Sequence, residues 1–251
     1  MIATIARNEV RRMFYSPLAW LILAVVQLVL ALLFLVLVDS FITQIQPRAA
    51  ALESPPGVTD AIVAPLFMWA GFVMLAVTPL LTMRLMSEER QRHTLPLLSS
   101  APLSSTEIIL GKYLGLLVFL LIMVAMISLM PVSLAAGTTL DWGKLGAGVL
   151  GLVLLLASFA AAGLYLSTLT AQPAVAAVTS FGLLLLLVLL YVSGSAQGTA
   201  SDLMVYLSHY DHFLSFLEGL FDTSDLAYYL LFIATFVILS IRRLDNERLQ
   251  R

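Results

Sequence analysis

The sequence contains no cysteine and only three histidines among its 251 residues. The lack of cysteine excludes disulfide bonds and thiolate metal sites, and we expect neither a metal nor a cofactor to be bound by this chain. Charged residues are also scarce, at 11% of the sequence, whereas globular proteins carry about 25%. This low charge content argues against an ordinary globular domain.

Hydrophobic residues make up 61% of the chain and are gathered into long blocks. A helix needs about 20 apolar residues to cross a bilayer, and several blocks reach that length. We therefore predict an all-α polytopic membrane protein whose residues 1–251 form a single transmembrane domain. The six predicted spans are Leu18–Val38, Ala61–Met83, Tyr113–Ala135, Leu145–Leu169, Ala174–Tyr191 and Leu226–Ile241.

The basic residues predict the orientation of these spans. Of the 13 Lys and Arg residues, all except Arg48 and Lys144 fall on the side of the two termini. Cytoplasmic segments of membrane proteins carry an excess of Lys and Arg. We therefore expect both termini in the cytoplasm of a bacterial inner membrane.

Two segments outside the spans have recognisable patterns. Residues 1–16 carry apolar side chains at roughly helical spacing before the Ser16-Pro17 break, which predicts an interfacial "elbow" helix. A simple positively charged flank is the alternative. Residues 39–60 are expected to form an irregular loop, because several helix breakers interrupt them: Pro47, Pro55, Pro56 and Gly57.

Small residues recur four apart near the third and fourth spans. Such stripes let helix backbones approach closely in lipid. They fit packing within one subunit or a seam between two copies. The residues are Gly111 and Gly115, then Gly143, Ala147 and Gly151, then Ala157 and Ala161.

Residues 201–224 are too polar to span the membrane and too apolar for a free loop. Aromatic side chains prefer the membrane interface, so we predict a re-entrant or interfacial helical segment on the outer side. His209, Asp211 and His212 could be imagined as a metal cluster, but on a helix only the two histidines share a face. Hydrogen bonding at the outer interface is the preferred interpretation.

The segment 84–112 is the long stretch of mixed charge that lies between two spans. Its pattern predicts a short helix, a proline break and a second helix with a Ser/Thr cap, which suits docking of a soluble partner better than catalysis. Gly111-Lys112 lacks the preceding glycine of a phosphate-binding loop, so this chain is not expected to bind or hydrolyse ATP.

The paired glutamates Glu88 and Glu89 raise an alternative function. Two glutamates followed four residues later by arginine, with distant histidines, are typical of intramembrane glutamate-type proteases. Here His93 stands at the arginine position, and the pair lies at a helix end in a charged loop. A glutamate base would have to be desolvated to work near neutral pH, so local ion pairs are the simpler interpretation.

The run from Met83 to Pro102, with Glu107 to Lys112 after it, resembles the signature of ABC-2 type transporter permeases. Two positions depart from that pattern, His93 where glycine is usual and Pro96 where glutamate is usual. A second region is similar to the gliding-motility-associated and nitrous-oxide-reductase-maturation branch of these permeases. It comprises His212, Phe213 and the run from Gly219 to Tyr229.

The resemblance implies a permease subunit, in a homodimer or a close heterodimer, bound to two separate ATPase subunits that carry ATP and Mg²⁺. It also implies export or mechanotransmission; an accessory protein in the periplasm or membrane is a further candidate partner, and no nucleic acid is expected. The segment after the second span would be the coupling helix that fits a groove of the ATPase. Its residues would be Glu88, Glu89, Arg90, Gln91, Arg92, His93, Thr94 and Leu95.

Overall fold

The protein is described by a computed structural model over residues 1–49, 57–92, 103–194 and 207–249. Within these ranges it is helical and contains no strand. Six helical segments are long and apolar enough to cross a membrane, which confirms the six-span prediction. The elements are α1 (Ile2–Tyr15), α2 (Pro17–Ser40), η1 (Phe41–Ile45), α3 (Gln46–Ala49), η2 (Thr59–Val63), α4 (Ala64–Thr82), α5 (Ser87–Gln91), α7 (Ser105–Ser133), η3 (Leu134–Ala136), α8 (Trp142–Leu169), α9 (Pro173–Gly194), α11 (His209–Leu217) and α12 (Thr223–Leu249).

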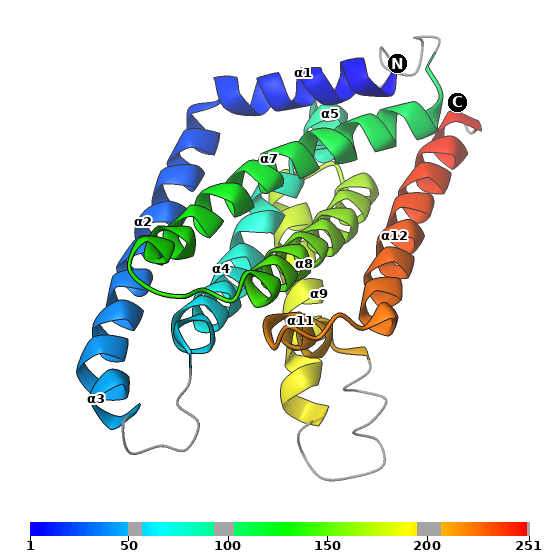
Figure 1. Ribbon diagram of the computed structural model, residues 1–251. Helices are drawn as coiled ribbons and strands as arrows, with labels where there is room; N and C mark the ends of the chain where they lie inside the picture. The colour runs from blue at the N-terminus through cyan, green and yellow to red at the C-terminus, as the bar shows by residue number, and fades with distance from the viewer. Residues whose placement is uncertain (50–56, 93–102, 195–206, 250–251) are drawn as a thin grey trace.

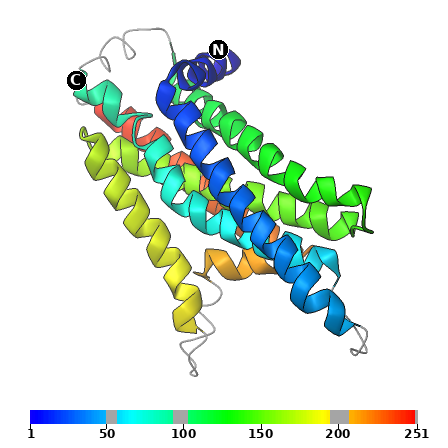
Figure 2. The same cartoon turned by 90° about the vertical axis from the view of Figure 1, so that its left-hand side faces the viewer.

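The elements gather at two ends of the bundle (Figures 1 and 2). Helix α1 lies across one end, together with α5, the start of α7 and the end of α12. Both termini lie at this end, which we call the termini end. Helices α3 and α11 lie at the opposite end. An even number of spans brings the two ends of the chain to the same side.

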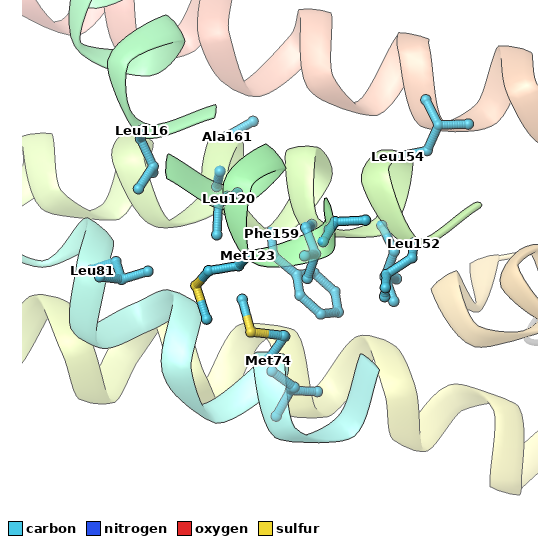
Figure 3. Close-up of a cluster of buried hydrophobic side chains, with 14 of the residues drawn as sticks. Met74, Leu81, Leu116, Leu120, Met123, Leu152, Leu154, Phe159 and Ala161 are labelled. Atoms are coloured by element: carbon cyan, nitrogen blue, oxygen red, sulfur yellow. The ribbon is translucent and has the colours of Figure 1, made fainter. Parts of the chain in front are cut away.

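Helix α8 is the centre of the subunit, with 72% of its most apolar stretch buried. Its small residues admit bulky neighbours: a Cβ added at Gly148 would lie 2.8 Å from the Phe67 ring, and one at Gly151 would lie 2.6 Å from Phe216 Cβ. In Figure 3, Met74, Met123 and Phe159 point toward one another between α4, α7 and α8. Of the predicted stripe on this span, Gly151 therefore serves packing within the subunit, as does Gly148 beside it, whereas Gly143 is exposed.

Helix α1 packs on the first turns of α7. A Cβ at Gly111 would lie 2.6 Å from Ile5 Cβ, and one at Gly115 would lie 2.7 Å from Glu9 Cβ. This second glycine pair thus also serves packing within the subunit. Ser104 caps α7 in a reciprocal capping box with Glu107, which confirms the predicted capped helix start.

The loop predicted over residues 39–60 is wrong for its first half. Helix α2 continues through the wide turn η1 into α3 and ends only at Ala49. Thr43 donates its hydroxyl to the Asp39 carbonyl at 2.8 Å, one helical turn back. Polar residues in this stretch therefore bond to the helix backbone and continue it.

Candidate functional site

The short helix α5 follows directly on α4 and is fastened to α8 by one hydroxyl. Ser167 Oγ accepts hydrogen bonds from the backbone N–H groups of Met86 and Ser87, both at 3.1 Å. The same hydroxyl donates to the Met83 carbonyl at 3.1 Å. These backbone groups lie where the α4 hydrogen-bond ladder is interrupted, so Ser167 replaces partners that the turn removes.

A buried lysine joins three helices at the termini end. Lys112 in α7 is only 3% exposed. Its Nζ lies 2.6 Å from Glu89 Oε1 in α5 and 3.3 Å from Glu9 Oε2 in α1. A buried cation is costly unless paired, so the two carboxylates are what allows Lys112 to occupy this position.

A second layer of ion pairs covers this buried lysine. Arg12 in α1 contacts Glu88 at 3.1 Å and Glu89 at 3.8 Å. Arg92 contacts Glu88 at 2.7 Å, yet its side chain remains 69% exposed. The paired glutamates thus hold α1 to α5, while Arg92 stays accessible at the surface.

Arg90 faces into the subunit. Its guanidinium lies 2.7 Å from Glu247 in α12, and its side chain is 12% exposed. This ion pair joins α5 to α12, and the ATPase contact expected of Arg90 stays a prediction. Gln91 and Arg92 are exposed, whereas the predicted contacts His93, Thr94 and Leu95 lie outside the described residues.

Two hollows flank α5. One, of about 280 Å³, lies between α1, the start of α2, the end of α4 and α5. The other, of about 310 Å³, lies between α5 and the start of α9. Arg84, Glu88 and Arg92 line both hollows. Helix α5 is therefore a ridge with recesses on two sides, a shape that a protein partner can grip.

A second polar cluster lies at the opposite end and joins α11 to α12. His212 Nδ1 lies 2.6 Å from Asp225 Oδ1, and both side chains are buried. Tyr229 donates its hydroxyl to the His209 carbonyl at 2.6 Å, and the Tyr228 hydroxyl lies 2.8 Å from His209 Nδ1. The sequence analysis named the two histidines and missed Asp225, because spacing along the chain carries no sign of this pairing.

Burial shifts the pKa of two side chains of α11, His209 and Asp211. Loss of hydration lowers the pKa of His209 to about 3, so its imidazole is neutral near pH 7. Burial also raises the pKa of Asp211. The other two residues that the sequence singled out here are structural: Phe213 is buried in the core, and Gly219 follows α11 with φ of +82°.

The glutamate-protease alternative finds no support in this arrangement. Glu88 and Glu89 lie in α5 at the termini end, whereas His209 and His212 lie in α11 at the opposite end (Figure 1). Within the described ranges, both glutamates are held in ion pairs with Arg12. The structure therefore brings neither Glu88 nor Glu89 together with His209 or His212.

Six apolar helices, of which α8 is the most buried, define a multi-pass helical membrane protein. Residues 3–249 match the family described as ABC-2 family transporter protein, and the chain belongs to that family. It is thus a transmembrane subunit of an ABC transporter, a membrane component that is generally non-catalytic and that works with ABC ATPase subunits. A search among curated proteins found no match.

Proposed function

We propose that two cytosolic ATPase subunits grip the α5 ridge of this permease and its second copy, and that ATP hydrolysis on those subunits drives export or mechanotransmission. The observation that supports this is the fastening of α5. Ion pairs tie it to α1, α7 and α12, and Ser167 ties it to α8. Gln91 and Arg92 remain exposed.

This fastening suits the transfer of force. A soluble motor can shift the permease between two conformations only if its contact has different affinity for each of them. A loosely attached α5 would move alone, whereas the observed α5 must carry the attached helices with it. The ATP and Mg²⁺ belong to the partner in this scheme.

The sidedness and the assembly are part of the proposal. The termini end, with Arg7, Arg11 and Arg84 exposed, faces the cytoplasm of a bacterial inner membrane according to the positive-inside rule. We place the second permease copy on α9, whose most apolar stretch is only 22% buried, the same share as in α2 and α12. A Cβ at Gly182 on this helix would meet nothing within 4 Å.

The gliding-motility and nitrous-oxide-reductase-maturation branch stays a prediction. It rests on the sequence from Gly219 to Tyr229, which in the structure ends the α11 turn and begins α12. An accessory partner of that branch would meet the opposite end, at or near α11.

The test is charge reversal on the exposed side of α5. The permease is purified with the ATPase encoded beside it, and its stimulation of ATP hydrolysis is measured in lipid nanodiscs. Arg92→Glu should weaken ATPase association by about tenfold or more. The introduced carboxylate would face the ATPase groups that receive an arginine, and two like charges across an interface cost several kcal/mol. The fold should survive, since an exposed pair within a helix is worth about 0.3–0.5 kcal/mol.

The matched control is Arg243→Glu. Arg243 is exposed on α12 near the termini end but lines neither hollow beside α5. It should leave association and stimulation unchanged. Full ATPase stimulation in Arg92→Glu, or an equal loss in both variants, would refute docking on α5.

A further inference from the structure

Two chemically different sets of side chains line the hollow between α1, α2, α4 and α5. The first set is charged and consists of the arginines Arg12, Arg84 and Arg92 with the carboxylates Glu9 and Glu88. The second set is apolar and consists of Met13, Leu18, Ala19, Leu80, Leu81 and Leu85. A ligand that fills the hollow must carry a charged group and an apolar portion next to each other.

Three arginines and two glutamates line the hollow, so one positive charge is left without a carboxylate partner. Arg12 and Arg92 share the carboxylate of Glu88. Arg84 is exposed and forms no ion pair with any residue in the described part of the chain. Glu9, the other carboxylate that lines the hollow, is paired with Lys112. The side chains around the hollow therefore carry a net positive charge, which suits an anion.

The corner between α1 and α2 lies beside the hollow and carries two exposed aromatic residues, Tyr15 at 73% and Trp20 at 59% exposure. Trp20 Nε1 donates to the Phe14 carbonyl at 2.8 Å, and Leu21, the next residue, is 63% exposed. Tyr and Trp are enriched at headgroup depth in membrane proteins, so these residues favour a position of the hollow at the membrane–water interface.

We propose that this hollow binds the headgroup of an anionic phospholipid. Arg84, with Arg12, holds the phosphate, and an acyl chain runs along the apolar side chains that include Leu18 and Leu80. Basic pockets between transmembrane helices at the cytoplasmic surface bind anionic headgroups in this way. This site goes beyond the proposed function, because it requires neither the ATPase nor a cargo. The bound lipid bridges α1 to the α4–α5 turn and so braces the ridge.

The test measures the thermal stability of the purified, delipidated permease with three added probes. The probes are dioleoyl phosphatidylglycerol, dioleoyl phosphatidylcholine and inorganic phosphate. Native mass spectrometry of the same samples counts retained phosphatidylglycerol. We expect phosphatidylglycerol alone to raise the melting temperature. Arg84→Gln should weaken its binding about fivefold, since one arginine near a lipid headgroup is worth about 1 kcal/mol.

Two variants keep the result interpretable. Arg84→Lys retains the charge and should retain most of the binding. Arg243→Gln removes an exposed arginine of α12, outside the hollow, and should bind like the unchanged protein. Equal stabilisation by phosphatidylcholine would show that acyl chains alone are recognised, and stabilisation by inorganic phosphate would indicate a soluble anion. Either outcome, or equal losses in Arg84→Gln and Arg243→Gln, overturns the proposal.

Discussion

Replacement of Lys112 by methionine should destabilise the permease strongly. The methionine fills much of the same volume but leaves Glu89 and Glu9 without the cation that lies 2.6 Å and 3.3 Å from them. Removing one partner from a buried ion pair costs about 3–5 kcal/mol, because the remaining charge is left uncompensated. Arg12, at 3.8 Å from Glu89, is too distant to replace Lys112. We therefore expect a loss within this range, equivalent to a melting temperature lower by on the order of 10 °C.

The measurement is thermal unfolding of the purified permease in detergent, followed by tryptophan fluorescence. The control is a triple variant, Lys112→Met with Glu9→Gln and Glu89→Gln, which removes all three charges at once. Replacing a buried ion-pair group by neutral residues is often tolerated, so the triple variant should recover most of the lost stability. A loss below about 1 kcal/mol for Lys112→Met, or a triple variant no more stable than the single one, would refute the role given to this lysine.

Three further predictions concern other parts of the fold and use the same unfolding assay. Gly115→Val should lower the free energy of unfolding by about 1–3 kcal/mol, because its Cβ would press on Glu9. Gly146→Val, at a position that faces open space, should lower it far less. Equal losses in the two variants would contradict the close contact of α1 with α7. Below pH 6.5 the unfolded chain binds a proton that buried His209, with its pKa lowered to about 3, does not take up. Stability should therefore fall by about 2 kcal/mol between pH 7 and 5, and His209→Asn should abolish this part of the fall. Gly219→Ala should lower the free energy of unfolding by about 1–2 kcal/mol, because φ is +82° at this position. Gly219→Asn should lower it less, since asparagine tolerates this backbone conformation better. Equal losses would show that the backbone conformation is not the cause.

The six spans could be predicted because apolar blocks of sufficient length have one solution in lipid, a hydrogen-bonded helix. Their ends could not be predicted equally well. Asp39 and Thr43 look like loop residues, yet Thr43 bonds back to the Asp39 carbonyl and the helix continues. Polarity shows where a helix leaves the apolar core of the membrane, which is a different point from where the helix ends.

The position of the α5 segment could be predicted, but its contacts could not. Lys112 and Glu9 are 103 residues apart, and one sequence contains no sign that they meet. The same holds for Arg90, whose ion pair with Glu247 has no sign in the sequence. Charge and spacing identify groups that need partners; the packing of distant helices decides which partners they receive.

The hydroxyl of Ser167 has a consequence for how a stroke delivered to α5 spreads. If the turn after α4 were flexible, α5 would rotate by itself and its displacement would not reach the other helices. Three backbone groups of this turn are held by one side chain of α8. Under the proposed docking, a displacement of α5 would therefore be passed to α8 at the middle of the bundle with little loss.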